Sequence, residues 1–221
     1  GISPSVKDKI AIAKLIDGLG VSFIEGGWPG ASPKEEEFFE TAKRELNLKN
    51  AKLVSFGSTR KLDLSAKDDP QVKALVDSGT DYVCIVGKSS KLHITKALQT
   101  DVDSAIDMAV DTILYLKSKG KKVFFDAEHF FDGYKEDSET SLKILESVVT
   151  AGADCFIFCD TNGGTLPEEV RKILSEVVEQ YPKTKFGVHF QNDNGCAVVN
   201  SMVAVDPVSY THLTLPTMAI V

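Results

Sequence analysis

The chain has 221 residues, of which 43% are hydrophobic, and its formal net charge is −7. This length and apolar content suffice for one sizeable core, so a single domain over residues 1–205 is expected. The acidic balance, with no Lys/Arg cluster, argues against a nucleic-acid partner. No apolar run reaches the roughly 18 residues that a membrane-spanning helix needs, which argues against a membrane protein.

Four cysteines, Cys84, Cys155, Cys159 and Cys196, are spread along the chain without a C-x-x-C pair. Three of them lie in or beside apolar runs, where cysteine behaves as a small hydrophobic residue. We therefore expect reduced core thiols and a cytoplasmic location. No signal peptide opens the chain, but it starts at Gly1 without a methionine, which leaves an upstream targeting segment open.

Short apolar runs alternate with longer amphipathic, charged segments along the chain. Helices are expected at 5–19, from Ser32-Pro33 onward, at 70–78 and at 101–119, with a later one capped by Thr165 just before Pro167. The apolar runs lack alternation, which is typical of strands buried on both faces of a parallel sheet. Strands are expected at 21–24, 51–56, 82–86, 122–125, 155–159 and 185–188.

The spacing of the expected strands indicates the fold. They recur about every 30 to 40 residues, as strand–helix units of a parallel α/β architecture do. A helix precedes the first strand, which implies a strand before it. Six strands, one lost at the front and one lost at the back give the eight of a TIM barrel, so an incomplete (β/α)8 barrel is predicted. A doubly wound open sheet is the alternative, but neither G-x-G-x-x-G nor a P-loop motif supports it.

Residues 206–221 break this pattern. The stretch has no helical period and contains two prolines, Pro207 and Pro216. Residues 209–217 resemble the peptide that results when a sequencing adapter is translated. We therefore expect residues 206–221 to be a non-native tail outside the fold.

Three of the predicted strands end in polar residues that can carry chemistry. Asp126-Ala127-Glu128-His129, Asp160-Thr161-Asn162-Gly163 and His189-Phe190-Gln191 follow them directly. Active sites of parallel α/β folds lie at this end of the strands, so one shared site is predicted. Taken singly, each group has an ordinary explanation: a solvated carboxylate, a turn with a helix cap, or a structural histidine.

Several longer stretches resemble the acyl-CoA-dependent synthases of the metal-dependent aldolase-like barrels. This family contains the isopropylmalate, homocitrate and citramalate synthases, and the likeness is greatest to the citramalate synthases. The matching segments are FIEGGWPG at 23–30, FGSTR at 56–60, GKS at 87–89, DAEHFFDGY at 126–134, CDTNGGTLP at 159–167, and 195–201 running on from His189.

The resemblance implies a reaction and a set of site residues. Acetyl-CoA would be condensed with pyruvate to (R)-citramalate for isoleucine synthesis, with the oxo acid polarised by Mg, Mn or Zn. The parent protein would be a homodimer. The implied residues are Glu128 as the catalytic group, Thr161, Glu25 and Asp126 as substrate-binding groups, and His189 and Gln191 as metal ligands.

The chain departs from the family pattern in ways that keep alternatives open. Gln191 stands where relatives have a second metal-binding histidine, and an Arg-Asp pair of the family's first strand would precede Gly1. The family's later metal-binding Asn and C-terminal region are also absent, so the 221-residue chain itself is expected to be inactive. The alternatives are an isopropylmalate or homocitrate synthase, a related lyase, or a non-catalytic homologue with an altered metal site.

Overall fold

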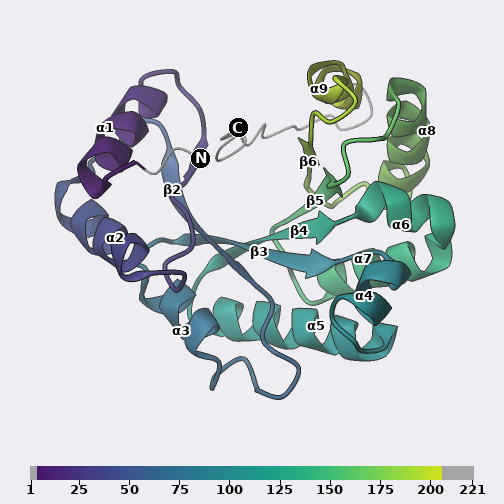
Figure 1. Ribbon diagram of the computed structural model, residues 1–221, viewed down its shortest axis with the longest axis horizontal. Helices are drawn as coiled ribbons and strands as arrows, with labels where there is room; N and C mark the ends of the chain where they lie inside the picture. The colour runs from purple at the N-terminus through teal and green to yellow at the C-terminus, as the bar shows by residue number, and fades with distance from the viewer. Residues whose placement is uncertain (1–3, 206–221) are drawn as a thin grey trace.

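The computed structural model describes residues 4–205, and the predicted tail at 206–221 lies outside that range. Six parallel strands form one sheet in the order β1-β2-β3-β4-β5-β6 (Figure 1). The strands are β1 Phe23–Glu25, β2 Lys52–Ser58, β3 Tyr82–Lys88, β4 Lys122–Glu128, β5 Cys155–Asp160 and β6 Phe186–Phe190. The helices are α1 Val6–Asp17, α2 Pro33–Glu45, α3 Pro70–Asp77, α4 Lys91–Lys96, α5 Val102–Ser118, α6 Phe130–Glu136, α7 Ser138–Thr150, α8 Pro167–Val178 and α9 Ala197–Val205.

This arrangement confirms the predicted α/β fold, an incomplete barrel with six parallel strands. The sheet curves, and the helices lie along an arc on its outer side (Figure 1). Each strand pairs with the next one in the chain, and among residues 4–205 the sheet ends at β1 and β6 without closing. None of the helices in this range has the length and apolar character that a membrane crossing requires.

The outer face of the sheet carries the main hydrophobic core. Phe125, Phe156 and Phe158 point from the central strands toward the helices and are at most 1% exposed. Residues of β2 to β5 that point to the other, concave side of the sheet form a smaller apolar group. They are Val54, Cys84, Phe124, Cys155, Ile157 and Cys159. Because side chains alternate along a strand, this second group marks the face on which later residues of each strand can line a site.

Local sequence signals account for most helix starts. Ser32 caps α2 by accepting a hydrogen bond from the Glu35 N–H, and Pro33 occupies the first turn as predicted. Two short helices were not predicted, α4 and α6, and both lie directly after a strand end. They occupy the same side of the half-barrel as the polar strand ends and help to shape it (Figure 1).

Candidate active site

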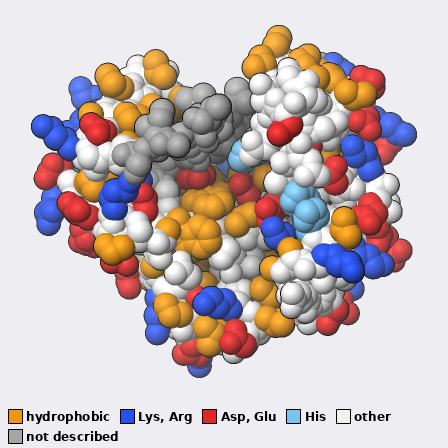
Figure 2. Space-filling view, viewed as in Figure 1, with side chains coloured by type: hydrophobic (Ala, Val, Ile, Leu, Met, Phe, Trp, Pro, Cys, Tyr) orange, Lys and Arg blue, Asp and Glu red, His pale blue; other side chains and the backbone are white. Residues whose placement is uncertain are grey.

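The predicted polar residues of β4 lie on the concave face. Phe124 belongs to the inner apolar group, so Asp126 and Glu128 share its direction by alternation. Figure 2 shows this face hollowed at its middle, with apolar side chains on the floor and acidic and imidazole groups beside them. The arrangement supports the prediction that separate strand ends contribute to one site.

Asp126, Cys159 and His189 form a compact group of possible metal ligands. Each offers one ligand atom, and the three atoms lie within 4.8 Å of one another. His189 Nδ1 is 3.8 Å from Asp126 Oδ2, and this neighbouring carboxylate raises the pKa of His189 against the opposing effect of burial. A carboxylate, a thiol and an imidazole are donors that suit a divalent cation such as zinc.

Further thiols and a second carboxylate surround Asp126. The Cys84 thiol donates a hydrogen bond to Asp126 Oδ1 at 3.3 Å. Burial, followed by the charge of Asp126, raises the pKa of both Cys84 and Cys159 well above the ordinary value. Glu25, a predicted substrate-binding residue, lies at the end of β1. Its charge contributes to the raised pKa values of Cys84, Cys159 and His189, so it lies near these groups.

Glu128 lies in a second polar group beside the first. Its carboxylate forms an ion pair with Lys88, which is its register partner on β3. Thr161 Oγ1 accepts a hydrogen bond of 2.8 Å from the His129 N–H, which ties the β5 end to the β4 end. The Thr161 hydroxyl can therefore still donate a hydrogen bond to another acceptor.

His129 lies closer to Glu128 than continued strand geometry predicts. If the strand continued, alternation would turn the His129 side chain away from Glu128. Instead the residue adopts a left-handed conformation with φ of 60°, and its Nε2 lies 4.0 Å from Glu128 Oε1. Its ring stacks on His93 with centroids 3.5 Å apart, and burial, followed by His93, lowers the pKa of His129.

Asp160 and Thr165 hold the turn between β5 and α8 in place. The Asp160 carboxylate accepts hydrogen bonds from the Thr165 N–H and hydroxyl, at 3.1 and 3.0 Å, and both residues are fully buried. The prediction of Thr165 as the helix cap was wrong, because Leu166 occupies that position. The Thr165 hydroxyl is instead used to hold the turn onto β5.

Gln191 follows the end of β6, two residues beyond His189. Its backbone N–H donates to the Asp160 carbonyl at 3.2 Å, and the residue is exposed. Its role as a metal ligand stays a prediction. Sequence reasoning missed Cys159, which it counted as an apolar core residue, and Lys88, whose position at the end of the third strand was the available signal.

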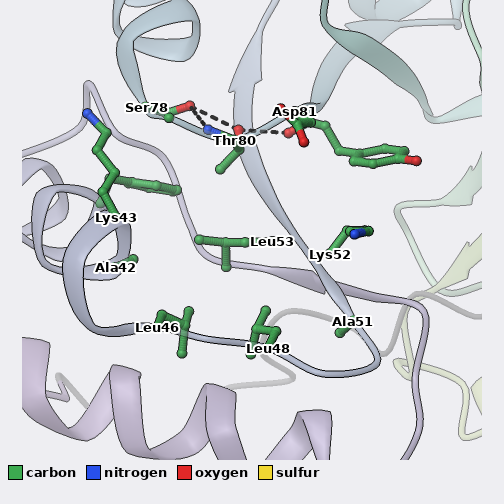
Figure 3. A pocket seen from close by; sticks show the side chains of 13 residues that line it. Ala42, Lys43, Leu46, Leu48, Ala51, Lys52, Leu53, Ser78, Thr80 and Asp81 are labelled. Atoms are coloured by element: carbon green, nitrogen blue, oxygen red, sulfur yellow. Dashed lines mark hydrogen bonds between the residues drawn. The ribbon is translucent and has the colours of Figure 1, made fainter.

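A separate cavity of about 260 Å³ lies between α2 and the beginnings of β2 and β3 (Figure 3). It is at the opposite end of the strands from the polar group. Ser78 and Thr80 on its wall hydrogen-bond to each other at 2.9 Å, and Thr80 bonds onward to the Tyr82 carbonyl. Ser78 and Thr80 therefore already have hydrogen-bond partners within the protein.

Known proteins with similar sequences include several synthases. The chain is 46% identical over 206 residues to (R)-citramalate synthase of Streptomyces coelicolor and 48% identical over 205 residues to that of Aquifex aeolicus. Each match covers 93% of this chain and 38% or 39% of the relative, so the chain spans about two fifths of their length. Homocitrate synthase of Sulfurisphaera tokodaii is 31% identical over 209 residues, covering 93% of this chain and 43% of that protein.

The fold also matches solved structures. HMG-CoA lyase of Bacillus subtilis superposes with a TM-score of 0.78, at 16% identity, over 95% of this chain and 70% of that one. At this identity the likeness concerns the fold alone. The HMGL-like family matches residues 2–207, nearly the whole chain, and the chain therefore belongs to the HMGL-like family.

Proposed function

We propose that this chain is part of an acyltransferase that condenses acetyl-CoA with pyruvate to give (R)-citramalate. The observation that carries the proposal is the 46% to 48% identity to two (R)-citramalate synthases across 93% of the chain. The sequence identity to homocitrate synthase is lower, at 31%, which favours pyruvate as the oxo acid. The product would enter isoleucine synthesis, in a cytoplasmic homodimer.

The residues on the concave face suggest how the substrates would be held. A divalent ion bound at His189, with the Gln191 amide as the expected second ligand, would polarise the carbonyl of the oxo acid. Thr161, whose oxygen accepts the His129 N–H, can donate its own proton to the substrate carboxylate. Glu25 and Asp126 would line the substrate side of the same site.

Glu128 is the proposed catalytic group, next to the acetyl group of acetyl-CoA. Its ion pair with Lys88 fixes the carboxylate at the concave face. A carboxylate held there can accept a proton or orient the group that does so, which is the task that carbon–carbon bond formation from a methyl thioester requires. The enolate carbon then attacks the carbonyl carbon of pyruvate, and hydrolysis of the thioester releases CoA.

The experiment is a thiol-release assay on a version of the protein that spans the full length of its relatives. Pyruvate should support acetyl-CoA-dependent release of CoA better than a branched or a dicarboxylic oxo acid. One methylene in an apolar pocket changes selection by only about 10- to 200-fold, so all three must be compared. Preference for a larger oxo acid would favour an isopropylmalate or homocitrate synthase.

Absence of both turnover and bound metal in that protein would favour the non-catalytic alternative. The 221-residue chain is the matched comparison. Among the described residues its sheet ends at β1 and β6 and does not close into a barrel. We therefore expect no CoA release from this chain alone.

A further inference from the structure

His129 holds a backbone conformation that residues with a Cβ rarely adopt. Its φ is 60°, and Gln99 is the one other non-glycine residue with a positive φ between residues 4 and 205. Because this left-handed conformation is unfavourable in itself, contacts with the surrounding structure must hold it. His129 follows Glu128 at the end of β4 and precedes α6, so the turn sets the direction in which both neighbouring segments run.

Two backbone hydrogen bonds and one ring contact hold the turn at His129. Its N–H donates to the Thr161 hydroxyl oxygen at 2.8 Å, and its carbonyl accepts from the Gly133 N–H at 2.9 Å. Its ring stacks on that of His93, with centroids 3.5 Å apart and planes 9° from parallel. His129 is 7% exposed, so the ring is enclosed by protein. The stack is therefore the contact through which the side chain itself supports the turn.

His93 comes from a different strand–helix unit of the sheet. It lies in α4, which follows β3, whereas His129 follows β4. The stack therefore ties the segment after β4 to the segment after β3. A backbone hydrogen bond runs alongside it, from the Ser89 N–H to the Glu128 carbonyl at 2.9 Å. His93 thus reaches the polar strand ends through the His129 ring.

The turn at His129 acts on two groups of the proposed site. In an extended backbone, alternation would turn the ring away from Glu128, and the N–H would point away from Thr161. In the observed turn, His129 Nε2 lies 4.0 Å from Glu128 Oε1, while Lys88 forms its ion pair with Oε2. The His129 N–H occupies an acceptor position of the Thr161 hydroxyl, which directs the proton of that hydroxyl elsewhere.

We propose that His93 and His129 are positioning residues of the synthase, whose stacked rings fix the left-handed turn that aims the Glu128 carboxylate and the Thr161 hydroxyl. The inference rests on the proposed function for the roles of these two groups, whereas the state of the turn can be measured without turnover. Stacking requires a flat ring but no particular nitrogen atom. A different aromatic residue at position 93 should therefore support the turn as well as histidine does.

The proposal predicts which kinetic constants depend on the stack. Thr161 would bind the oxo acid, so loss of its orientation should raise KM for pyruvate. Glu128 would act on the acetyl group in the chemical step, so loss of its orientation should lower kcat. Most of the CoA molecule lies beyond the reacting acetyl group, so KM for acetyl-CoA should change little. A variant that only lowers the amount of folded protein reduces the apparent kcat and leaves both KM values unchanged.

The kinetic experiment is the thiol-release assay on variants of the full-length protein. His93→Ala should raise KM for pyruvate by about 3- to 10-fold, the effect of one weakened hydrogen bond. It should lower kcat by about 10- to 100-fold, the effect of a misplaced catalytic group. His93→Phe keeps a flat ring and should restore both constants. Leu92→Ala is the matched control, because Leu92 precedes His93 in α4 and is 48% exposed, and it should behave like the original protein.

A second pair of variants separates the ring of His129 from its backbone turn. Asparagine adopts the left-handed conformation more readily than alanine does. His129→Asn should therefore keep KM for pyruvate near the original value, whereas His129→Ala should raise it as His93→Ala does. Both variants remove the ring beside Glu128, so both should lower kcat.

The turn itself is measured on the 221-residue chain by NMR. Hydrogen exchange of the His129 amide reports the bond from this N–H to the Thr161 oxygen. Exchange should be at least about 10-fold faster in His93→Ala than in the original chain, because the bond opens more often. It should be unchanged in His93→Phe and in Leu92→Ala. Circular dichroism checks that all four proteins are folded.

Unchanged exchange of the His129 amide in folded His93→Ala would overturn the positioning role. Unchanged KM for pyruvate and kcat in full-length His93→Ala would do the same, and so would a failure of His93→Phe to restore them. If the full-length protein releases no CoA with any oxo acid, the proposed function fails, and the catalytic roles of Glu128 and Thr161 fail with it. Faster exchange in His93→Ala would still show, in that case, that the stack holds the turn.

Discussion

Lys88 and Glu128 are register partners on β3 and β4, and their side chains form an ion pair at the concave face. The side chains are 22% and 25% exposed, so water screens the pair only in part. Partly exposed pairs of this kind contribute roughly 0 to 1 kcal/mol to stability. The pair therefore matters mainly because it fixes the direction of the Glu128 carboxylate.

Glu128→Gln should separate catalysis from folding. In the full-length protein the substitution removes the carboxylate but keeps the shape, so turnover should fall about 10²- to 10⁴-fold while the melting temperature barely changes. Lys88→Met keeps the carboxylate and should reduce turnover less, and Lys88→Arg should restore most of that loss. Thiol release and thermal unfolding measure the two effects. Near-normal turnover in Glu128→Gln would remove Glu128 from the catalytic role.

Thr165→Val should destabilise the fold. The hydroxyl of Thr165 donates to Asp160 Oδ1 inside the protein, and valine leaves that buried oxygen without this partner. A buried acceptor left unsatisfied costs about 1 to 3 kcal/mol. Thr150→Val is the control, because Thr150 is exposed at the end of α7 and should change little. Urea unfolding of both variants gives the comparison, and equal midpoints would contradict a structural role for the turn.

The turn from Asp160 to Thr165 shows which features of the fold the sequence predicts and which it does not. The strand spacing predicted the incomplete barrel, because each strand among the described residues is a short, largely apolar run that a helix follows in the chain. The sequence could also have predicted where the Asp160 side chain points. Residues 156, 158 and 160 share one face of the strand, and Phe156 and Phe158 face the helices. The sequence prediction assigned Asp160 and Thr161 to one polar group, although alternation along the strand places their side chains on opposite faces.

Other parts of the site depend on contacts between strands. Cys159 has the composition of a core residue, and only the approach of Asp126 and His189 from β4 and β6 makes it a possible ligand. His129 departs from strand geometry through a single left-handed residue, which no apolar pattern signals. Such features arise from tertiary packing, so a single sequence contains little trace of them.

Gly133→Ala should be poorly tolerated. A Cβ at this position of α6 would lie 2.5 Å from the Ser89 carbonyl oxygen and 2.8 Å from the Ser90 Cα, and backbone atoms cannot rotate away. Overpacking of this kind typically costs about 1 to 3 kcal/mol, and here it would push α6 away from the end of β3. Gly164→Ala is the control, because a Cβ there meets nothing within 4 Å. Chemical unfolding should show a lower midpoint for Gly133→Ala alone; equal losses in both variants would argue against close packing of α6.

His129, which stacks on His93, should make stability depend on pH. Burial, followed by the neighbouring His93, lowers the folded-state pKa of His129, so the unfolded chain takes up a proton more readily than the folded one. The contribution of His129 to stability should therefore fall as the pH drops from about 7.5 to about 5, through the ordinary histidine range near 6.5, whereas the raised pKa of His189 acts in the opposite direction. His129→Asn suits the left-handed conformation and carries no titrating group. The variant should lose packing at every pH but show a flatter pH profile in urea unfolding. An NMR titration that gives His129 a pKa at or above the ordinary value, or an unchanged slope in His129→Asn, would contradict this account.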